Sequence, residues 1–296
     1  MSRTLSEGSY GNQCRRGIEL ASGFEVAGKE AAERALAAAG VSRPDFVMVY
    51  MTVGHDPAEL LPAIRAVTGN APLTGCSVSG CIMREGANES VYCVEVAVIA
   101  SDELKLHTAS VSDITQDPEA AGRAVGESLR PHYGDNAVAF LFFGDAFTLN
   151  YTAVKRGIDS ALGINRFVPF LGGGANNDVQ STRTFQFHDD AIFEKGATCT
   201  LLSGSAAVVS AVTHGCYPLG MVQTVTRSKG NVIYELDGVP ALEVIKKYVT
   251  EEEDQNWLYT VNNLCLGLEA PDALVDDYDR LCVRYMVGPE TSMRAA

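Results

Sequence analysis

Positive charge is scarce in this sequence. Its 296 residues include 23 Lys and Arg against 37 Asp and Glu, which gives a formal net charge of −14. No stretch of five residues is rich enough in Lys and Arg to reverse that charge locally. Because such a field repels phosphate backbones and anionic lipid surfaces, the sequence predicts neither a nucleic-acid partner nor a membrane partner.

An export signal is also missing. The first residues, MSRTLSEGSYGNQC, lack the apolar core of a signal peptide. Residues 196–226 contain no Asp, Glu, Lys or Arg, but Ser203, Gly204 and Ser205 interrupt this stretch and Pro218 follows. Its Val and Thr residues favour two buried antiparallel strands over a membrane span. We therefore expect a cytoplasmic protein.

The cysteines lack the spacing of a metal site or a redox motif. Eight are present and none forms a C-x-x-C pair. Without an export signal, neither a disulfide framework nor a zinc ribbon is indicated. Most lie in apolar runs, so we expect all eight to be reduced and Cys93, Cys199 and Cys265 to be buried. The cysteines stand at positions 14, 76, 81, 93, 199, 216, 265 and 282.

Several motifs of catalysis and nucleotide binding are absent. No Gly-Lys-Ser or Gly-Lys-Thr occurs, so there is no P-loop. The run GGGANN has Asn177 where a dinucleotide fingerprint needs its third glycine, and G-x-S-x-G fails around Ser77 and Ser79. The five histidines, at 55, 107, 132, 188 and 214, show no zinc spacing. The sequence therefore predicts no catalytic residue and no metal site.

What the chain does have is a large apolar content and a repeated order of elements. With 46% hydrophobic and 20% charged residues it can bury a substantial core. The first copy, residues 24–113, is predicted to hold a helix at 26–39, a strand at 46–54, a helix within 56–69, a strand at 72–80 and a hairpin at 91–111. The second copy, residues 115–213, is predicted to hold a helix from Asp117 and Pro118, a strand at 136–145, a helix at 151–162, a strand at 167–178 and a hairpin at 197–213.

Landmarks in the two copies keep a slowly growing offset. Gly54 matches Gly144, Gly75 matches Gly172, and a turn at Ser101 matches one at Ser203. This pattern favours a duplication, although any α/β protein alternates such elements. We predict an α/β fold of two duplicated units with mixed sheets, related by a pseudo-twofold axis, with the helices outside and the sheets toward a shared core.

After His214 the chain changes character. A hairpin with Gly230 in its turn, a short helix within 239–249 and the beginning of a strand at 284–286 indicate a partial C-terminal α+β domain. The predicted domains are an N-terminal segment at 1–23, a duplicated domain at 24–213 and this partial domain at 214–296.

Glycine and small polar residues gather at two strand ends. Three consecutive glycines give up side-chain packing, so either a neighbouring segment packs too close for a Cβ atom or a ligand approaches the backbone. Ligands of α/β proteins bind outside the carboxyl ends of strands. The predicted ligand-binding residues are Gly75, Cys76, Ser77, Ser79, Gly172, Gly173, Gly174, Asn176, Asn177 and Asp178.

An enzyme is the alternative that the residues leave open. Cys76 could act as a nucleophile with a histidine such as His55, His107 or His188 as base. Alternatively, Asp145 or Asp178 could act as a catalytic carboxylate. The sequence pairs none of these groups with a partner, so we predict that the protein is not an enzyme.

Four stretches carry a resemblance to a known family. VMVYMTVGHDP, PLTGCSVSGCI, VPFLGGGANND and the later LDGVPAL resemble the FIST proteins, across roughly residues 20 to 286. The resemblance implies an intracellular sensory module of signal transduction that binds a small polar ligand, with an amino acid or a similar anion as the candidate.

The resemblance also sets expectations for cofactor and partner. Some FIST proteins are reported to bind haem and respond to nitric oxide, so a haem sensor is an alternative function; without C-x-x-C-H, such a haem is not covalently attached. The chain stops early in what resembles the C-terminal FIST domain and shows no kinase, cyclase or chemoreceptor segment. We therefore expect a signalling partner that acts in trans.

Overall fold

The computed structural model describes residues 6–10, 23–83, 86–177, 183–211, 214–230, 232–251, 260, 263–270 and 281–286. The chain divides into two compact units, Met1–Val208 and Val209–Ala296. None of the helices within those described ranges is both long enough and apolar enough to span a lipid bilayer.

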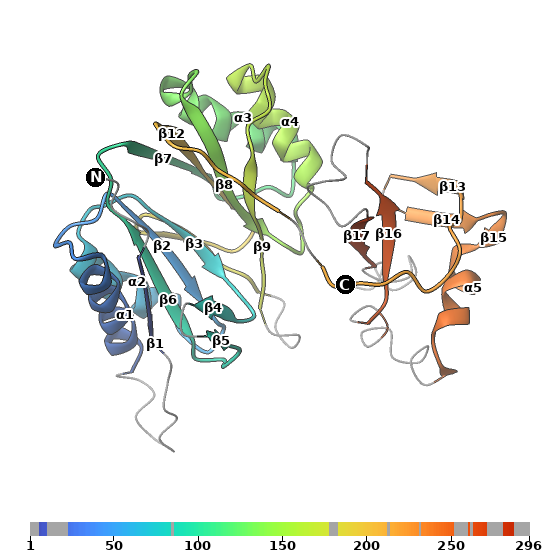
Figure 1. The fold of residues 1–296 in the computed structure, drawn as a ribbon, viewed down its shortest axis with the longest axis horizontal. Coiled ribbons are helices and arrows are strands. Elements are labelled where there is room, and N and C mark those ends of the chain that lie inside the picture. Colours follow the sequence, from blue (N-terminus) through green and yellow to red (C-terminus); the bar gives the residue numbers. More distant parts are fainter. Residues whose placement is uncertain are drawn as a thin grey trace. The chain divides into compact units, whose positions relative to one another are not determined.

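Two mixed sheets form the centre of the first unit (Figure 1). The strands are β1 (Ser6–Tyr10), β2 (Phe46–Met51), β3 (Leu73–Ser77), β4 (Cys81–Met83), β5 (Gly86–Asn88), β6 (Val94–Ile99), β7 (Leu104–Val111), β8 (Ala137–Asp145), β9 (Phe170–Ala175), β10 (Gln186–His188), β11 (Ala191–Phe193) and β12 (Ala197–Gly204). The first sheet has the order β1-β6-β2-β3-β10-β11, and the second has the order β7-β12-β8-β9. The pairs β2/β3 and β8/β9 are parallel, whereas the other pairs are antiparallel. Strands β4 and β5 form a separate hairpin.

The helices begin and end where the sequence signals place them. In α3 the Asp117 side chain caps the first turn by accepting a hydrogen bond from the Ala120 N–H, and Pro118 takes the first helical position. Gly163 ends α4 in the left-handed conformation. Pro62 lies inside α2 on its exposed side. The helices of the first unit are α1 (Gly23–Ala39), α2 (Pro57–Thr68), α3 (Pro118–Leu129), the 3-10 helix Arg130–His132, and α4 (Tyr151–Leu162).

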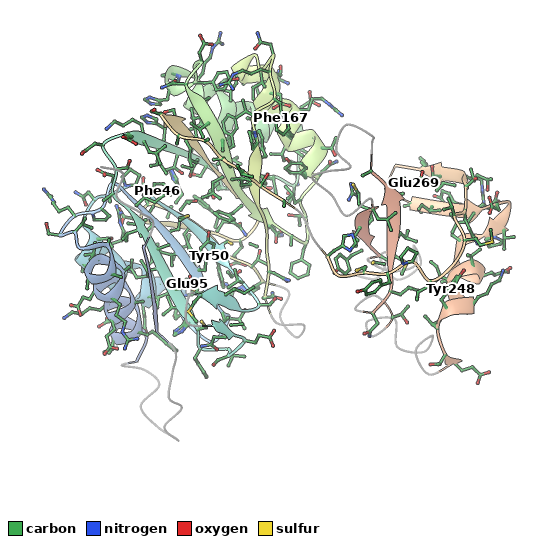
Figure 2. All side chains as sticks on the ribbon, viewed as in Figure 1. Phe46, Tyr50, Glu95, Phe167, Tyr248 and Glu269 are labelled. Carbon is green, nitrogen blue, oxygen red and sulfur yellow. The ribbon has the colours of Figure 1, made fainter. Side chains whose placement is uncertain are left out.

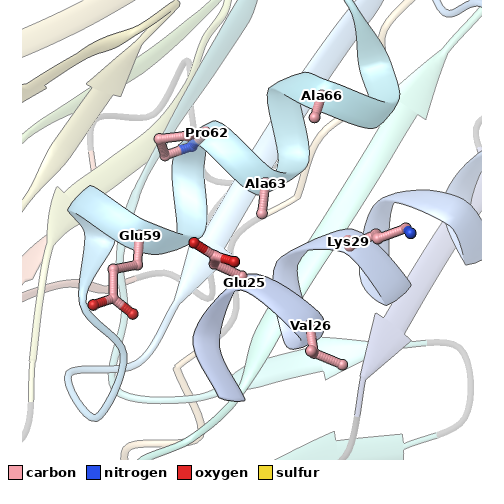
Figure 3. Close-up of a pocket in the computed structure, with 7 residues that line it drawn as sticks. All are labelled: Glu25, Val26, Lys29, Glu59, Pro62, Ala63 and Ala66. Atoms are coloured by element: carbon pink, nitrogen blue, oxygen red, sulfur yellow. The ribbon is translucent and has the colours of Figure 1, made fainter. Parts of the chain in front are cut away.

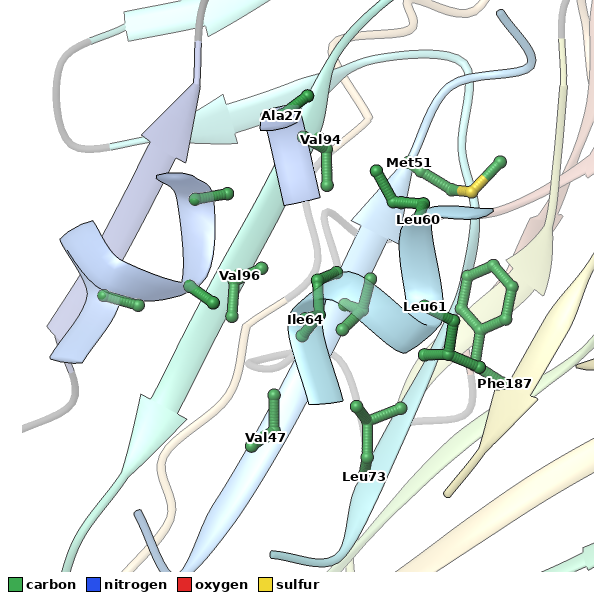
Figure 4. Packing of buried hydrophobic residues seen from close by; sticks show 14 of the residues in the cluster. Ala27, Val47, Met51, Leu60, Leu61, Ile64, Leu73, Val94, Val96 and Phe187 are labelled. Carbon is green, nitrogen blue, oxygen red and sulfur yellow. The ribbon is translucent and has the colours of Figure 1, made fainter. Parts of the chain in front are cut away.

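Four layers result, with the helices outside as predicted. Helices α1 and α2 cover one face of the first sheet, where Leu60, Ile64 and Val96 belong to one buried cluster (Figure 4). Helices α3 and α4 cover the second sheet through another cluster. The uncovered faces of the sheets pack on each other, and the Thr74 and Thr198 hydroxyls are hydrogen bonded between them at 2.8 Å. The fold is α/β, as the sequence predicts.

The two sheets share one strand order. When the order β1-β6-β2-β3 is aligned with the order β7-β12-β8-β9, each strand matches one that runs in the same direction. In both sheets, one helix connects the first strand in this order to the third, and another connects the third to the fourth. This supports a duplication, but with copies that run from β1 to β6 and from β7 to β12. These bounds differ from the predicted 24–113 and 115–213, because β7 belongs to the sheet of the second copy. The landmark pair Gly54 and Gly144 is not equivalent, because Gly54 lies in the turn after β2 whereas Gly144 lies inside β8.

The predicted hairpin at 91–111 is wrong. Strand β6 pairs with β1 and β2, and β7 pairs with β12 of the other sheet. The connection around Ser101 therefore crosses from one sheet to the next. A short loop can span the roughly 10 Å between stacked sheets as well as the roughly 5 Å between paired strands, so its length does not distinguish the two cases.

The second predicted hairpin is also wrong. Strand β12 is buried, but residues 205–211 form no strand and Val209 is 95% exposed. Both sides of β12 are occupied, by β7 and by β8, so no edge is free for a hairpin partner. The uncharged stretch at 196–226 is thus one buried strand followed by exposed residues rather than two buried strands.

The described part of the second unit contains short strands and the short helix α5 (Ala241–Ile245). The predicted hairpin with Gly230 in its turn and the predicted short helix are both confirmed. Residues Arg284 and Tyr285 end a strand that begins three residues before Arg284. The elements are β13 (Val225–Lys229), β14 (Val232–Leu236), β15 (Val239–Pro240), α5 (Ala241–Ile245), the 3-10 helix Lys246–Tyr248, β16 (Cys265–Glu269) and β17 (Leu281–Tyr285).

Candidate functional site

The two glycine-rich strand ends lie next to each other in the first unit. The Asn176 N–H donates to the Ser77 carbonyl at 2.9 Å, and the Ser79 hydroxyl donates to the Asn177 carbonyl at 2.7 Å. The end of β3 is therefore joined directly to the end of β9, although the two strands belong to different sheets. The structure brings together the segments that the sequence places in one site.

A third segment closes this junction from the side of β10. The Ser77 hydroxyl accepts a hydrogen bond from the Phe185 N–H at 2.9 Å, and the Ser77 N–H donates to the Phe185 carbonyl at 2.8 Å. The Asn177 side-chain amide donates to the Arg183 carbonyl. Because Ser77 and Asn177 are buried and satisfied by these partners, they hold the loops in place and do not face solvent.

Asp145 holds the loop that follows β8. Its Oδ1 accepts from the Thr184 hydroxyl at 2.6 Å, and its Oδ2 accepts from the Thr148 N–H at 3.1 Å. Gln186 extends the network, donating to the Thr184 hydroxyl and accepting from the Gly196 N–H, each at 3.0 Å. Both carboxylate oxygens are engaged by the protein itself and the residue is 2% exposed, which disfavours a catalytic role for Asp145.

Packing explains three of the glycines. A Cβ atom on Gly75 would lie 1.9 Å from the Val49 carbonyl oxygen, and one on Gly172 would lie 2.0 Å from the Phe142 carbonyl oxygen. In both cases the contact is with the residue opposite in the parallel neighbour strand. Gly172 also has a φ of +121°, and a Cβ on Gly174 would lie 2.7 Å from that of Ala146. Close approach of a neighbouring segment therefore accounts for these positions.

Gly173 differs from its neighbours. Among the described residues, no atom lies within 4 Å of the position that its Cβ would occupy, and Gly173 is exposed. Strand alternation places Gly173 on the same face as Ala175, which packs with Cys76 and Phe143 between the sheets. Gly173 thus opens toward the layer between the sheets, and packing does not explain it.

Strand β9 and the neighbouring inner face frame this opening. Among the described residues, β9 pairs on one side only and is an edge strand of its sheet. Phe143, which is opposite Gly173 on β8, makes an edge-to-face contact with Tyr50 at 5.7 Å between ring centres. Glu95 is opposite Tyr50 on β6 and is buried, and Figure 2 shows both side chains in the first unit.

The predicted ligand residues divide by exposure. Gly75, Cys76, Ser77 and Asn177 are buried, whereas Ser79, Gly172, Gly173, Gly174 and Asn176 are exposed. Asp178 lies outside the described residues. We call the exposed members the rim; they lie on β9 and in the loops that follow β3 and β9. The buried members lie beneath the rim.

Cys76 and Cys199 are poor nucleophiles. Burial raises the pKa of the Cys76 thiol to about 12, and its strand neighbours are Tyr50 and Gln186 rather than a histidine. Burial also raises the pKa of Cys199. Such thiols are protonated at neutral pH, which disfavours the Cys76 enzyme hypothesis.

The thiol predictions are met in part. Cys93 and Cys199 are buried as predicted, but Cys265 is only half-buried, because β16 belongs to a two-stranded sheet. All seven cysteines in the described ranges are free thiols.

His55, one of the histidines named as a candidate base for Cys76, is buried. It lies in the loop before α2, between the rings of Phe24 and Tyr92, with ring-centre distances of 5.4 and 6.0 Å. Burial lowers the pKa of His55, and a backbone contact with Tyr92 opposes this in part. Neither ring nitrogen has a hydrogen-bond partner of normal geometry. Aromatic side chains enclose this imidazole, so its surroundings do not favour its use as an axial haem ligand.

A surface hollow of about 390 Å³ lies between α1 and α2 (Figure 3). Its walls combine carboxylates, an ammonium group and small apolar side chains, and one carboxylate oxygen of Glu59 is buried there without a hydrogen-bond partner among the described residues. No motif in the sequence marks this hollow, which lies on the helical layer rather than at the strand ends. The lining residues are Glu25, Val26, Lys29, Glu59, Pro62, Ala63 and Ala66.

Comparison with known families decides the classification. The FIST N domain matches residues 45–239, which is more than half of the chain and runs from β2 to β15. The chain belongs to the FIST family. FIST domains are sensory domains of signal transduction.

One relative of this FIST chain is an uncharacterised protein of Methanocaldococcus jannaschii. The two are 25% identical over 189 residues, which cover 60% of this chain and 35% of the relative. The chain therefore spans about a third of the length of that protein. The relative is uncharacterised and therefore suggests no ligand.

Proposed function

We propose that this FIST chain is a sensory module that binds a small polar ligand at the rim around Gly173. The observation that supports this most is the open space at Gly173 between two tightly packed glycines. Packing requires glycine at Gly172 and Gly174, whereas the absent side chain at Gly173 leaves exposed space that is available to a ligand.

The exposed rim offers suitable chemistry. Gly172 and Gly174 direct their N–H groups to the open edge of β9, because the parallel ladder with β8 uses the backbone of Gly173, so these two N–H groups are candidate donors for a carboxylate or a similar small anion. The Ser79 hydroxyl and the Asn176 amide lie on the same rim and would orient the bound molecule. Because the net charge of −14 opposes an anion at long range, such local donors are required. An amino acid suits this arrangement, since its ammonium group is favoured by the same field.

The ligand signal would pass to a partner protein. The rim is built from loops that the Ser77 and Asn177 hydrogen bonds join across the two sheets. A ligand seated there would contact both proposed copies and stabilise their junction. We propose that a signalling protein acting in trans recognises this stabilised form.

A thermal-shift screen tests the proposal. The compounds are amino acids, small carboxylates, nucleotides and haem, with an absorption spectrum to detect haem directly. A ligand at 100 times its Kd should add about 2.7 kcal/mol to the free energy of unfolding. Gly173→Val should abolish the shift, because its side chain fills the open space. Asn176→Ala should weaken binding by about 1–3 kcal/mol through loss of a polar partner.

Gly134→Val is the matched control. Gly134 precedes β8, away from the end of that strand where the rim lies, and the nearest atom to its Cβ position is 3.5 Å away. This variant should bind the ligand as the wild type does. If Gly173→Val still binds with unchanged affinity, the site is elsewhere.

A further inference from the structure

Two thiols of the second unit lie close together. The Sγ atoms of Cys216 and Cys265 are 3.7 Å apart, and 49 positions separate them along the chain. Both residues are half-buried, so small reagents can reach them. They differ in this from Cys76 and Cys199, which are fully enclosed.

His214 fixes the position of Cys216. The Cys216 N–H donates to the His214 Nδ1 at 3.0 Å, and the His214 Nε2 is 3.0 Å from the Leu281 carbonyl oxygen of β17. The imidazole is therefore in the tautomer with its proton on Nε2, and it connects the turn at Cys216 to the β16/β17 sheet. This anchoring holds the two sulfur atoms near each other.

The direction of the contact distinguishes the two thiols. The Cys265 S–H donates toward the Cys216 sulfur. Burial and the neighbouring Cys216 sulfur both raise the pKa of Cys265. Cys216 is thus suited to attack first, with Cys265 as the second, resolving thiol.

We infer that Cys216 and Cys265 form a reversible disulfide site that reacts with small-molecule disulfides such as oxidised glutathione. The Cys216 thiolate attacks one sulfur of the reagent, forms a mixed disulfide and releases one glutathione thiolate. The Cys265 thiolate then attacks the Cys216 sulfur, forms the protein S–S bond and releases the second glutathione thiolate. Two protein thiols are oxidised, one reagent disulfide is reduced, and the two protein protons pass to the released thiolates.

The structure can accommodate the bond. A disulfide requires an S–S separation of about 2.0 Å, so the sulfur atoms must approach by a little under 2 Å. Cys216 lies in a segment without helix or strand, and Cys265 is the first residue of β16. Side-chain rotation and a small movement of the Cys216 backbone therefore suffice. The closed loop would contain β13, β14, β15 and α5.

Peptide mapping of the full chain tests the inference. The purified protein is equilibrated in glutathione buffers of increasing oxidised fraction, its free thiols are blocked, and its peptides are analysed without reduction. We expect a peptide that links Cys216 to Cys265, a fall from eight titratable thiols to six, and an upward shift of Tm that reductant reverses.

Single substitutions provide the controls. Cys216→Ser and Cys265→Ser should each lose the linked peptide and the Tm shift. Cys282, on β17, is equally half-buried and is therefore the matched control. Cys282→Ser should retain both the linked peptide and the Tm shift, because the contact between the sulfur atoms of Cys216 and Cys265 does not involve it. A link that involves Cys282, a link between two chains, or no link in the wild type at the most oxidising ratio would overturn the inference.

Discussion

Gly172 and Gly173 are neighbours on β9, but an added side chain would meet another atom only at Gly172. Gly172→Ala places a Cβ 2.0 Å from the Phe142 carbonyl oxygen, in a residue whose φ is +121°. Gly173→Ala, one position further, meets no atom within 4 Å. The two variants change the same number of atoms on the same edge strand, so the unfolded chain is affected almost equally.

The two substitutions should change the free energy of unfolding in different directions. Overpacking costs about 1–3 kcal/mol and a left-handed backbone costs a further ~1–2 kcal/mol, so Gly172→Ala should lose about 2–5 kcal/mol. Gly173→Ala should range from neutral to about 1 kcal/mol more stable, because alanine restricts the unfolded chain. At about 2–4 °C per kcal/mol, the first variant should lower Tm by roughly 4–20 °C.

Urea unfolding followed by far-UV circular dichroism measures both values. Gly75→Ala serves as a positive control, since its Cβ would lie 1.9 Å from the Val49 carbonyl oxygen in the equivalent position of the first sheet. If Gly172→Ala and Gly173→Ala agree within about 0.5 kcal/mol, the typical range for surface changes, the distinction between packed and open glycines is refuted.

Two further predictions concern a helix cap and a buried imidazole. Asp117→Ala should lower the free energy of unfolding by about 0.5–2 kcal/mol, because the Ala120 N–H loses its acceptor. Asp117→Asn should recover most of this loss in the same urea experiment. Equal losses in the two variants would contradict the capping role. Burial lowers the pKa of His55 below 6.5, so the unfolded chain takes up this proton at a higher pH than the folded chain, and stability should decrease as the pH falls through 6.5. His55→Phe should reduce that decrease when unfolding is compared at acidic and neutral pH, and an unchanged pH dependence would refute the assignment.

Local signals in the sequence predict the helices and several turns. Asp117 with Pro118, and Gly163 after the last apolar residue, act through their own backbone neighbours, so no distant contact is needed to read them. The hairpin at Gly230 is equally local. These features are correct in the structure for that reason.

Strand pairing is the part that local signals do not determine. The loop at Ser101 looks like a hairpin turn, yet the strands on either side join different sheets. The partners of β6 and β12 come from far along the chain, so a prediction based on neighbours in the sequence chooses the wrong ones. The surroundings of His55 could not be predicted for a related reason, since Phe24 and Tyr92 enclose it only after the chain has folded.

The proposed duplication gives Gly173 a counterpart and shows why one ligand site is expected instead of two. Gly75 and Gly172 each contact the carbonyl of the opposite residue in a parallel neighbour, so they occupy the same place in the two copies. The next residue is Cys76 in the first copy and Gly173 in the second. The Cys76 side chain is buried between the sheets with Phe143 and Ala175, whereas the equivalent space at Gly173 is open. Gly173→Cys should therefore restore the filling of the first copy, leave the free energy of unfolding unchanged within about 1 kcal/mol and still block the ligand. Unfolding by urea and a thermal shift with the identified ligand measure the two effects. A variant that keeps its ligand would show that the difference between the copies at this position has no part in binding.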